Sequence, residues 1–231
     1  MHSAINFNQD KLFLTMPTTA SVKPQNKASK HTKNPPCLYV VATPLGNLAD
    51  ISLRAVEVLQ QVDLIAAEDT RHSQKLLSFY QIATRLISLH EHNEAERAKQ
   101  LVGFLQEGLS IALISDAGTP LIADPGYTLV NKVRQAGFQV SPLPGPSAVI
   151  AALSAAGLPT NSFSFYGFLP SKPSAKESFL TGVASQTSTL VFYEAPHRLL
   201  ASLASLIKVL GSQRQACIAR ELTKQFETFL T

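Results

Sequence analysis

The sequence has few cysteines and no long hydrophobic run. Only Cys37 and Cys217 occur among 231 residues, which excludes a disulfide framework and a cysteine-based metal cluster. No apolar stretch approaches the ~18 residues of a membrane span, and the run at 11–15 is too short for the core of a signal peptide. We therefore expect a cytoplasmic protein, in a reducing compartment, that has no membrane segment.

Nucleotide-binding motifs are absent as well. No G-x-G-x-x-G follows the first strand-like run and no G-x-x-x-x-G-K-[ST] occurs anywhere, so the usual phosphate cradle at a helix N-terminus is not supported. The segment Ser115–Gly126 also lacks Lys and Arg, although phosphate sites usually recruit cations. Its amides, small residues and carboxylates favour a ligand that is uncharged or cationic.

Positive charge is concentrated at the start of the chain. Of the 20 basic and 16 acidic side chains, five lysines and one aspartate lie in residues 1–36, which leaves 15 of each sign in residues 37–231. Residues 1–36 contain no glycine and little apolar periodicity, so we interpret them as a disordered basic leader. Affinity for RNA must then come from a local patch, from the leader, or from a region outside this chain.

What the sequence does contain is an alternation of strand-like and helix-like segments, which predicts an α/β fold. Five early strands joined by crossovers predict a mainly parallel sheet with helices on both faces. A rigid turn at residues 143–146 leads into a small-residue helix, for which Ser147 is a plausible N-cap. We therefore predict an N-terminal α/β domain at 37–146 and a C-terminal α/β domain at 147–231, with mainly parallel or mixed sheets. No strand is expected in residues 220–231, so the second domain is expected to be truncated. The expected strands are 38–42, 63–67, 85–89, 111–114, 138–143, 163–167, 189–193 and 215–219. The expected helices are 52–62, 73–80, 93–107, 127–136, 147–156, 175–184 and 196–210.

The stretch Ile111–Gly126 is the most informative part of the chain. The apolar run Ile111–Ile114 fits a buried strand, and a dense set of turn-forming residues follows it, with Leu121 and Ile122 in the middle. Connections between a strand and a helix usually run ~2–6 residues, so this longer loop is expected to wrap a small molecule. Polar loops also follow the other four strands, and the carboxyl ends of parallel strands lie at one edge of a sheet, where ligands bind. These other loops are Thr43–Asn47, Glu68–Arg71, His90–Asn93 and Pro144–Ser147.

Several residues in these loops could carry chemistry. His90 and His92 would share a face on a strand, but no third ligand has suitable spacing, so no metal is expected. They are interpreted either as a general base or substrate donor, or as helix-capping groups. Glu68, Asp69 and Arg71 are likewise open between a functional role and a structural salt bridge.

The motif FYEAPHR adds a carboxylate and two potential cations at the end of a later strand. Glu194 could hold ribose hydroxyls or an amino group. Arg198 could hold a phosphate or an internal acid.

Eight motifs occur in the order TPLGNLADIS, AEDTR, HEHN, ISDAGTPLIADPG, PGPSA, YGFLP, FYEAPHR and ARELTK. With these motifs the chain from Leu38 onward resembles the ribosomal RNA branch of the tetrapyrrole methylase superfamily, the class III methyltransferases that depend on S-adenosylmethionine (SAM). The resemblance implies SAM in a cleft between two α/β domains of a homodimer. It also implies methyl transfer to the ribose 2′-hydroxyl of a cytidine in the decoding region of small-subunit (16S) ribosomal RNA, on the small ribosomal subunit. SAM is cationic at sulfur and carries no phosphate, which agrees with a loop that lacks Lys and Arg. The implied SAM contacts are Leu45, Gly118, Thr119, Pro120, Ala123, Ser147, Ala148 and Glu194.

A ribose hydroxyl is a poor nucleophile, so its proton must be removed or hydrogen-bonded away. The candidate catalytic groups are His90, Glu68 and Asp69, among which the resemblance does not choose. Our hypothesis is that His90 accepts or orients the proton, that Glu68 or Asp69 fixes its tautomer, and that Arg71 holds an RNA phosphate. The residues expected to bind substrate are Asn47, Arg71, His92, Asn93 and Arg198.

Two alternatives remain open. The first is a SAM-dependent methyltransferase of the same fold that acts on a tetrapyrrole, although AEDTR and HEHN are typical of the ribosomal branch. The second is a non-catalytic SAM- or RNA-binding fragment, because the chain stops at Thr231, where members of the family continue.

Overall fold

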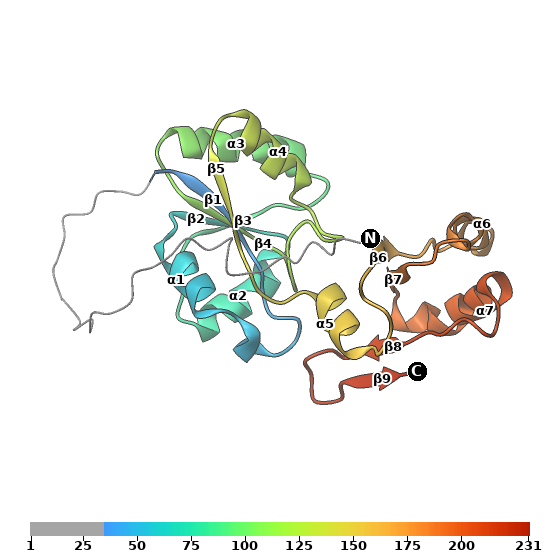
Figure 1. Ribbon diagram of the computed structural model, residues 1–231. Coiled ribbons are helices and arrows are strands. Elements are labelled where there is room, and N and C mark those ends of the chain that lie inside the picture. Colours follow the sequence, from blue (N-terminus) through green and yellow to red (C-terminus); the bar gives the residue numbers. More distant parts are fainter. Residues whose placement is uncertain (1–34) are drawn as a thin grey trace, which may run out of the picture. The chain divides into compact units, whose positions relative to one another are not determined.

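The structure is a computed structural model that describes residues 35–231 (Figure 1). Nearly all of the predicted basic leader, residues 1–36, therefore lies outside the described residues. Pro35–Thr231 groups as one unit, and the predicted domain boundary after residue 146 stays a prediction. No helix within residues 35–231 is long and apolar enough to cross a membrane.

The elements are β1 (Cys37–Val41), η2 (Leu48–Asp50), α1 (Leu53–Gln61), β2 (Leu64–Ala67), α2 (Thr70–Phe79), β3 (Leu86–Ser88), α3 (Glu94–Gln106), β4 (Ile111–Ile114), α4 (Tyr127–Gln135), β5 (Gln139–Leu143), α5 (Ala148–Ala155), β6 (Phe163–Phe168), α6 (Pro173–Val183), β7 (Thr189–Tyr193), η3 (Pro196–Arg198), α7 (Leu199–Leu210), β8 (Ile218–Arg220) and β9 (Thr228–Leu230).

Five parallel strands form the main sheet in the order β3-β2-β4-β1-β5. This confirms the predicted parallel α/β arrangement. The strand that leads into the expected ligand loop, β4, lies at the centre of the sheet, paired with β2 on one side and β1 on the other. A short, wholly apolar run such as Ile111–Ile114 suits this position, because a central parallel strand is covered on both faces.

The side chains of β4 alternate between two helical layers. Ile111 and Leu113 join a core cluster that contains residues of α3 and α4. Ala112 and Ile114 join a second cluster, which contains residues of α1 and α2. Because successive side chains of a strand point to opposite faces, these two clusters place α1 and α2 on one face of the sheet and α3 and α4 on the other (Figure 1).

The connections of the sheet reverse direction between β1 and β4. From β1 the chain passes through α1 to β2, and from β4 it passes through α4 to β5 on the other side of the pair. The two connecting helices cover opposite faces. In open α/β sheets, ligands bind in the crevice outside the carboxyl ends of such a strand pair. The loops after β1 and β4 therefore occupy the best position for a site.

The chain after residue 147 forms two small sheets. Strands β6 and β7 are parallel, with α6 between them in sequence. Aromatic side chains join this pair to α6: the Tyr166 ring centroid lies 5.3 Å from that of Phe179 and 5.8 Å from that of Phe192.

The last residues differ from the prediction. The strand expected at 215–219 lies instead at Ile218–Arg220, and Thr228–Leu230 pairs with it as the antiparallel strand β9. The prediction of no strand in 220–231 is therefore wrong. The pattern does not reveal β9, because this strand has only three residues and no Gly or Pro marks the turn before it. Glu221 and Thr223 make this turn with positive φ values of 53° and 66°.

Candidate active site

The loops after β1 and β4 are joined at Thr43 and Gly118. The N–H of Thr43 donates to the carbonyl of Gly118 at 2.8 Å, and the N–H of Gly118 donates to the carbonyl of Thr43 at 2.9 Å. The Thr43 hydroxyl adds a bond of 3.0 Å to the carbonyl of Ser115. Gly118 has a φ of +82°, and a Cβ there would lie 3.2 Å from Cδ2 of Leu45. Both the backbone conformation and the close approach of Leu45 therefore favour glycine at this position.

The middle of the loop Ser115–Gly126 is also held in place. The Thr119 hydroxyl donates to the carbonyl of Pro146 at 2.9 Å, which connects the loop to the turn before α5. Leu121 and Ala123 have positive φ values of 74° and 68°. Such a conformation costs roughly 1–3 kcal/mol in a residue other than glycine, and it persists only where the surrounding structure determines it.

The end of this loop is fixed by a carboxylate from another helix. Glu94, in the first turn of α3, accepts hydrogen bonds from the N–H groups of Gly126 and Leu129 through Oε1, both at 3.1 Å. These two groups belong to the N-terminal end of α4, where backbone donors have no partner within the helix. Glu94 thus caps α4 and anchors the loop that precedes it.

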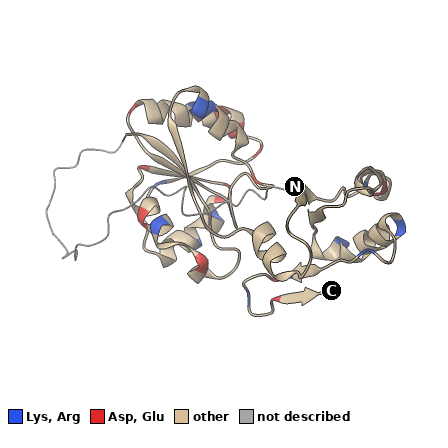
Figure 2. Cartoon of the chain, in the orientation of Figure 1, with Lys and Arg blue, Asp and Glu red and all other residues tan. Residues whose placement is uncertain are grey.

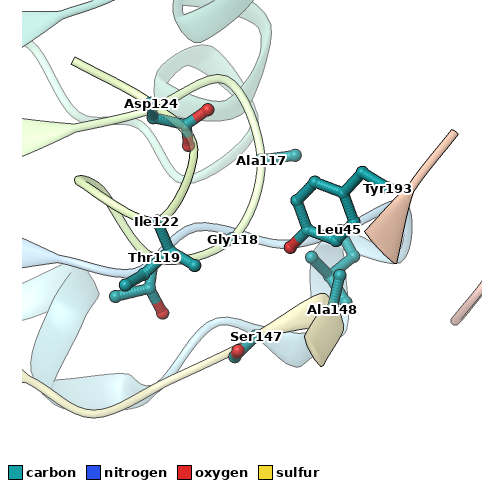
Figure 3. A pocket seen from close by; sticks show the side chains of 9 residues that line it. All are labelled: Leu45, Ala117, Gly118, Thr119, Ile122, Asp124, Ser147, Ala148 and Tyr193. Carbon is teal, nitrogen blue, oxygen red and sulfur yellow. The ribbon is translucent and has the colours of Figure 1, made fainter. Parts of the chain in front are cut away.

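A small pocket, with a cavity volume of about 50 Å³, lies at the carboxyl ends of β1 and β4 (Figure 3). This volume is below the ~300–1,000 Å³ that is usual for small-molecule sites, so the pocket itself encloses only part of such a ligand. Figure 3 shows that its side chains come from the loop after β1, the loop after β4, the start of α5 and the end of β7. No Lys or Arg is among the lining residues that the structure describes. The lining residues are Leu45, Ala117, Gly118, Thr119, Ile122, Asp124, Ser147, Ala148 and Tyr193.

Asp124 lines this pocket, and two further carboxylates, those of Glu68 and Asp116, lie close enough to influence its surroundings. Burial raises the pKa of Glu68, and the nearby charges of Asp124 and Asp116 raise it further. Burial also raises the pKa of Asp124, with a smaller contribution from Asp116, although a hydrogen bond with Ser115 opposes the change. The pKa of the Tyr193 hydroxyl is raised by burial and by the charge of Asp124. Charges of one sign at close range favour a positively charged ligand.

Comparison with known proteins decides the family. The sequence profile of the tetrapyrrole (corrin/porphyrin) methylases matches residues 37–231. The chain belongs to the tetrapyrrole methylase family. It is 58% identical over 193 residues to a ribosomal RNA small subunit methyltransferase I from Vibrio cholerae, covering 84% of this chain and 67% of that relative. The protein of the same name from Escherichia coli O157:H7 is 58% identical over 191 residues, or 83% of this chain and 67% of its own length. Among solved structures, the methyltransferase CobJ has the same fold, with a TM-score of 0.63 and 20% identity over 84% of this chain and 85% of its own.

The pocket of this tetrapyrrole methylase contains five of the eight residues expected to contact the cofactor. The five are Leu45, Gly118, Thr119, Ser147 and Ala148. Pro120 and Ala123 lie in the same loop but are not among the lining residues. The prediction misses four lining residues, Ala117, Ile122, Asp124 and Tyr193. All four lie inside the quoted motifs, and Asp124 is the most recognisable of them, as a carboxylate in a loop without cations.

The expectation that Glu194 contacts the cofactor is not supported by the geometry. Its carboxylate accepts hydrogen bonds from the Ser202 hydroxyl and, at 2.8 Å, from the N–H of Ala195. The Arg198 Nε lies 3.0 Å from Oε1, and the Lys176 Nζ lies 3.9 Å from Oε2. Burial acts to raise the pKa of Glu194, but these hydrogen bonds and positive charges hold it below its ordinary value.

This internal network also answers the question left open for Arg198. Its guanidinium pairs with Glu194 and donates to the carbonyl of Leu169, so in this structure it holds an internal acid. Successive side chains at the end of a strand point to opposite sides. Tyr193 therefore reaches the pocket, while the next residue, Glu194, pairs with α6 and α7.

Asp69 is the N-cap of α2. Its Oδ1 accepts hydrogen bonds from the N–H groups of Arg71 at 2.8 Å and His72 at 3.3 Å, and these bonds lower its pKa. This cap starts α2 at Thr70, three residues before the predicted start at residue 73. The Arg71 guanidinium lies 3.6 Å from the Asp69 carboxylate and is 93% exposed, so it extends into solvent.

The expectation that Glu68 or Asp69 fixes the tautomer of His90 is also not supported. The N–H of His90 donates to Oδ1 of Asn93 at 2.9 Å, which turns the amide nitrogen of Asn93 toward the ring, 3.1 Å from Nε2. Since that amide nitrogen can only donate, Nε2 accepts and the ring proton is on Nδ1. Nδ1 is buried and has no hydrogen-bond partner among the described residues. Asn93 is thus the residue that orients His90.

The other two residues expected to bind substrate lie on exposed loops. Asn47 caps η2 by accepting a hydrogen bond from the N–H of Ala49 at 3.1 Å. The ring of His92 lies edge to face with that of His90, with centroids 6.0 Å apart. Within residues 35–231, no three His, Cys, Asp or Glu side chains are arranged to hold a metal ion.

Proposed function

We propose that this chain transfers a methyl group from SAM to the ribose 2′-hydroxyl of a cytidine in the decoding region of small-subunit (16S) ribosomal RNA. The observation that carries the proposal is the 58% identity, over 84% of the chain, to a relative named as a ribosomal RNA small subunit methyltransferase. The pocket at the β1–β4 switch supplies a site for the methyl donor.

The residues of the pocket fit SAM, which carries a sulfonium cation and no phosphate. No described lining residue is Lys or Arg, and the lining includes the Asp124 carboxylate. The backbone of Gly118 faces the Leu45 side chain: a Cβ at residue 118 would lie 3.2 Å from it. We assign binding of SAM to Gly118 and Thr119, to Ser147 at the start of α5, and to the Leu45 side chain. When bound, SAM supplies an electrophilic methyl group.

We assign the role of proton acceptor to Glu68. Burial and the neighbouring carboxylates raise its pKa above the ordinary value, and a carboxylate with a raised pKa is a stronger proton acceptor. Asp69 is engaged as the cap of α2. The Nε2 of His90 is engaged by Asn93. These contacts leave Glu68 as the candidate base that stands beside a lining residue, Asp124.

We also propose that the protein is a two-fold homodimer that acts on the small ribosomal subunit in the cytoplasm. Large apolar side chains are exposed on α1 and α2, including Leu53 at 84% and Phe79 at 62%. Contiguous exposed apolar patches mark protein–protein interfaces, and in a two-fold dimer the same patch of each subunit forms the interface. Sedimentation at micromolar concentration is expected to give a dimer, and a monomer would contradict this part of the proposal.

Methyl transfer from tritium-labelled SAM tests the function. With unmethylated small ribosomal subunits, label is expected in 16S RNA and, after nuclease digestion, in 2′-O-methylcytidine. Label in a corrin precursor instead would identify a tetrapyrrole methyltransferase. Binding of SAM without transfer to either acceptor would identify a non-catalytic module. The variant Gly118→Val serves as the control that lacks the cofactor site.

A further inference from the structure

The motif ARELTK has no role in the pocket or in the proposed chemistry. It spans the end of β8 and the start of the turn toward β9, so its last residue, Lys224, lies in that turn. The turn is held by specific contacts. The N–H of Thr223 donates to the Glu227 carboxylate at 2.6 Å, and the N–H of Lys224 donates to the carbonyl of Glu221 at 3.0 Å.

The backbone conformation of this turn is costly. Glu221 and Thr223 have φ values of 53° and 66°, in the left-handed region that side chains disfavour. Conformations of this kind persist where the surrounding structure determines them, and they are common at functional sites. The effect of the turn is to fix the position of Lys224, whose N–H donates to Glu221 and whose carbonyl accepts from the N–H of Glu227 at 3.1 Å.

Lys224 is placed across the loop that follows β1. Its side chain passes so close to Gly46 that a Cβ at residue 46 would lie 2.6 Å from Cγ and 2.7 Å from Cε of Lys224. Only glycine leaves room for this packing. Gly46 follows Leu45, which lines the pocket, so Lys224 stands next to a wall of the cofactor site.

The ammonium group of Lys224 is available to a partner. Its Nζ lies 3.4 Å from the Glu221 carboxylate, and the two side chains are 46% and 39% exposed. An exposed ion pair of this type contributes little free energy, typically ~0–1 kcal/mol. An incoming anion can therefore share or replace Glu221 at small cost.

A cation at this place would offset the repulsion between the acidic pocket and the negatively charged RNA. Residues 37–231 carry 15 basic and 15 acidic side chains, and in Figure 2 the two signs are interspersed over the helices. The pocket itself contains Asp124 and no described Lys or Arg. Since RNA is held mainly through its phosphates, a cation at the rim of this acidic pocket would favour the approach of a target ribose by binding the adjoining backbone.

We propose that Lys224 binds a backbone phosphate of the RNA substrate at the rim of the pocket, and so places the target ribose over it. This inference rests on the function proposed above. Lys224 takes no part in the chemical step, and its stem, packed on Gly46, sets the position of the charge.

Binding of the full chain to small ribosomal subunits, measured by filter binding over a series of KCl concentrations, tests this inference. Lys224→Met keeps most of the stem and removes the charge. It is expected to raise the Kd for subunits about fivefold or more, and to lower the slope of log Kd against log salt by about one. The Kd for SAM should not change, and the loss of activity should appear more in KM than in kcat. Lys99→Met, which removes a charge from the exposed surface of α3, is the matched control and should alter neither the Kd nor the slope.

A second variant keeps the charge and moves it. Gly46→Ala places a Cβ against the stem of Lys224, so it is expected to weaken subunit binding as well. Combined with Lys224→Met it should add little further, because effects of residues in contact are not additive. Full additivity of the two substitutions would contradict the inference that packing on Gly46 positions the Lys224 side chain.

The possible results separate this inference from the proposed function. An unchanged Kd and slope for Lys224→Met would overturn the inference, and so would a weaker affinity for SAM with unchanged subunit binding. If the wild-type chain binds subunits but transfers no methyl group, the proposed function fails and the role of Lys224 is still decided by the binding data. If the wild-type chain does not bind subunits, both fail.

Discussion

Gly118 and Leu45 are complementary: the missing Cβ of the glycine is the space beside which the leucine packs. A Cβ at residue 118 would lie 3.2 Å from Cδ2 of Leu45, and the backbone at 118 has a φ of +82°. Both residues line the pocket, and they belong to the two loops that meet at the β1–β4 switch. The wall of the pocket therefore depends on a glycine for two separate reasons.

Gly118→Val is expected to abolish SAM binding, because the valine methyl groups displace Leu45 and fill the pocket wall. Isothermal titration calorimetry of the folded variant measures this directly. Gly137→Val is the matched control, since Gly137 also has a φ of +82° but a Cβ at that residue would meet no atom within 4 Å. It carries the same backbone strain, about 1–3 kcal/mol, and should retain SAM affinity. Unchanged SAM affinity in Gly118→Val would remove this loop from the site.

Glu68→Gln should lower kcat by about 10²–10⁴, the usual contribution of a general base, with little change in the Kd for SAM. The raised pKa of Glu68 also fixes the sign of two pH effects. Activity should fall as the pH decreases through this raised pKa, above the ordinary value of 4.5, because the protonated acid cannot accept a proton. The stability of the wild type should decline as the pH rises through the same range, because folding disfavours the charged form. Glu68→Gln should therefore be at least as stable as the wild type at neutral pH, as measured by thermal unfolding.

His90→Ala is the companion measurement for the base. Because Asn93 holds Nε2 and Nδ1 is buried, we expect the kcat of this variant to stay within about tenfold of the wild type at neutral pH. A loss of two or more orders of magnitude with normal SAM binding would return the role of base to His90, and Glu68 would then be a bystander.

Asp69 should prove to be a structural residue. Asp69→Asn preserves a good N-cap for α2, whereas Asp69→Ala removes it and is expected to cost about 0.5–2 kcal/mol of unfolding free energy. Urea unfolding distinguishes the two variants, and methyl transfer at a temperature where both are folded should be near normal in each. Loss of transfer in Asp69→Asn, with unchanged stability, would show that the carboxylate takes part in the reaction.

The network around Glu194 should contribute to stability more than an exposed ion pair does. Glu194→Ala leaves the buried Lys176 and the half-buried Arg198 without their acid, and we expect a loss of about 3–5 kcal/mol in unfolding free energy. Glu177→Ala breaks the Lys208–Glu177 pair, which has an N–O distance of 2.7 Å but is 67% and 32% exposed, and should cost less than about 1 kcal/mol. Equal costs for the two variants would contradict a buried role for Glu194.

The sequence predicts the sheet and the position of the site because these depend on local pattern. The apolar run Ile111–Ile114 and the long loop after it are visible in one dimension, and the parallel strand order makes the loops meet. The role of a single side chain depends instead on direction. Whether Tyr193 or Glu194 faces the pocket is decided by the pleat at the end of β7, which the motif does not reveal.

Contacts between distant segments and unusual backbone conformations account for the remaining differences. Asn93 takes the place of Glu68 and Asp69 as the partner of His90 because the turn after β3 closes on itself. Strand β9 is not predicted because the turn before it needs positive φ values at Glu221 and Thr223, which their residue types do not indicate. Neither feature has a signature in composition or periodicity.

The capping of α4 by Glu94 has a kinetic consequence. With Thr43 holding one end of the loop Ser115–Gly126 and Glu94 holding the other, this segment is not free to swing over the pocket. Little conformational entropy is then lost when the methyl donor arrives, and the spent donor does not wait for this segment to open. The used methyl donor should thus be replaced by a new one only after the RNA leaves the mouth of the pocket. Release of the methylated ribosomal RNA is then expected to limit the turnover rate.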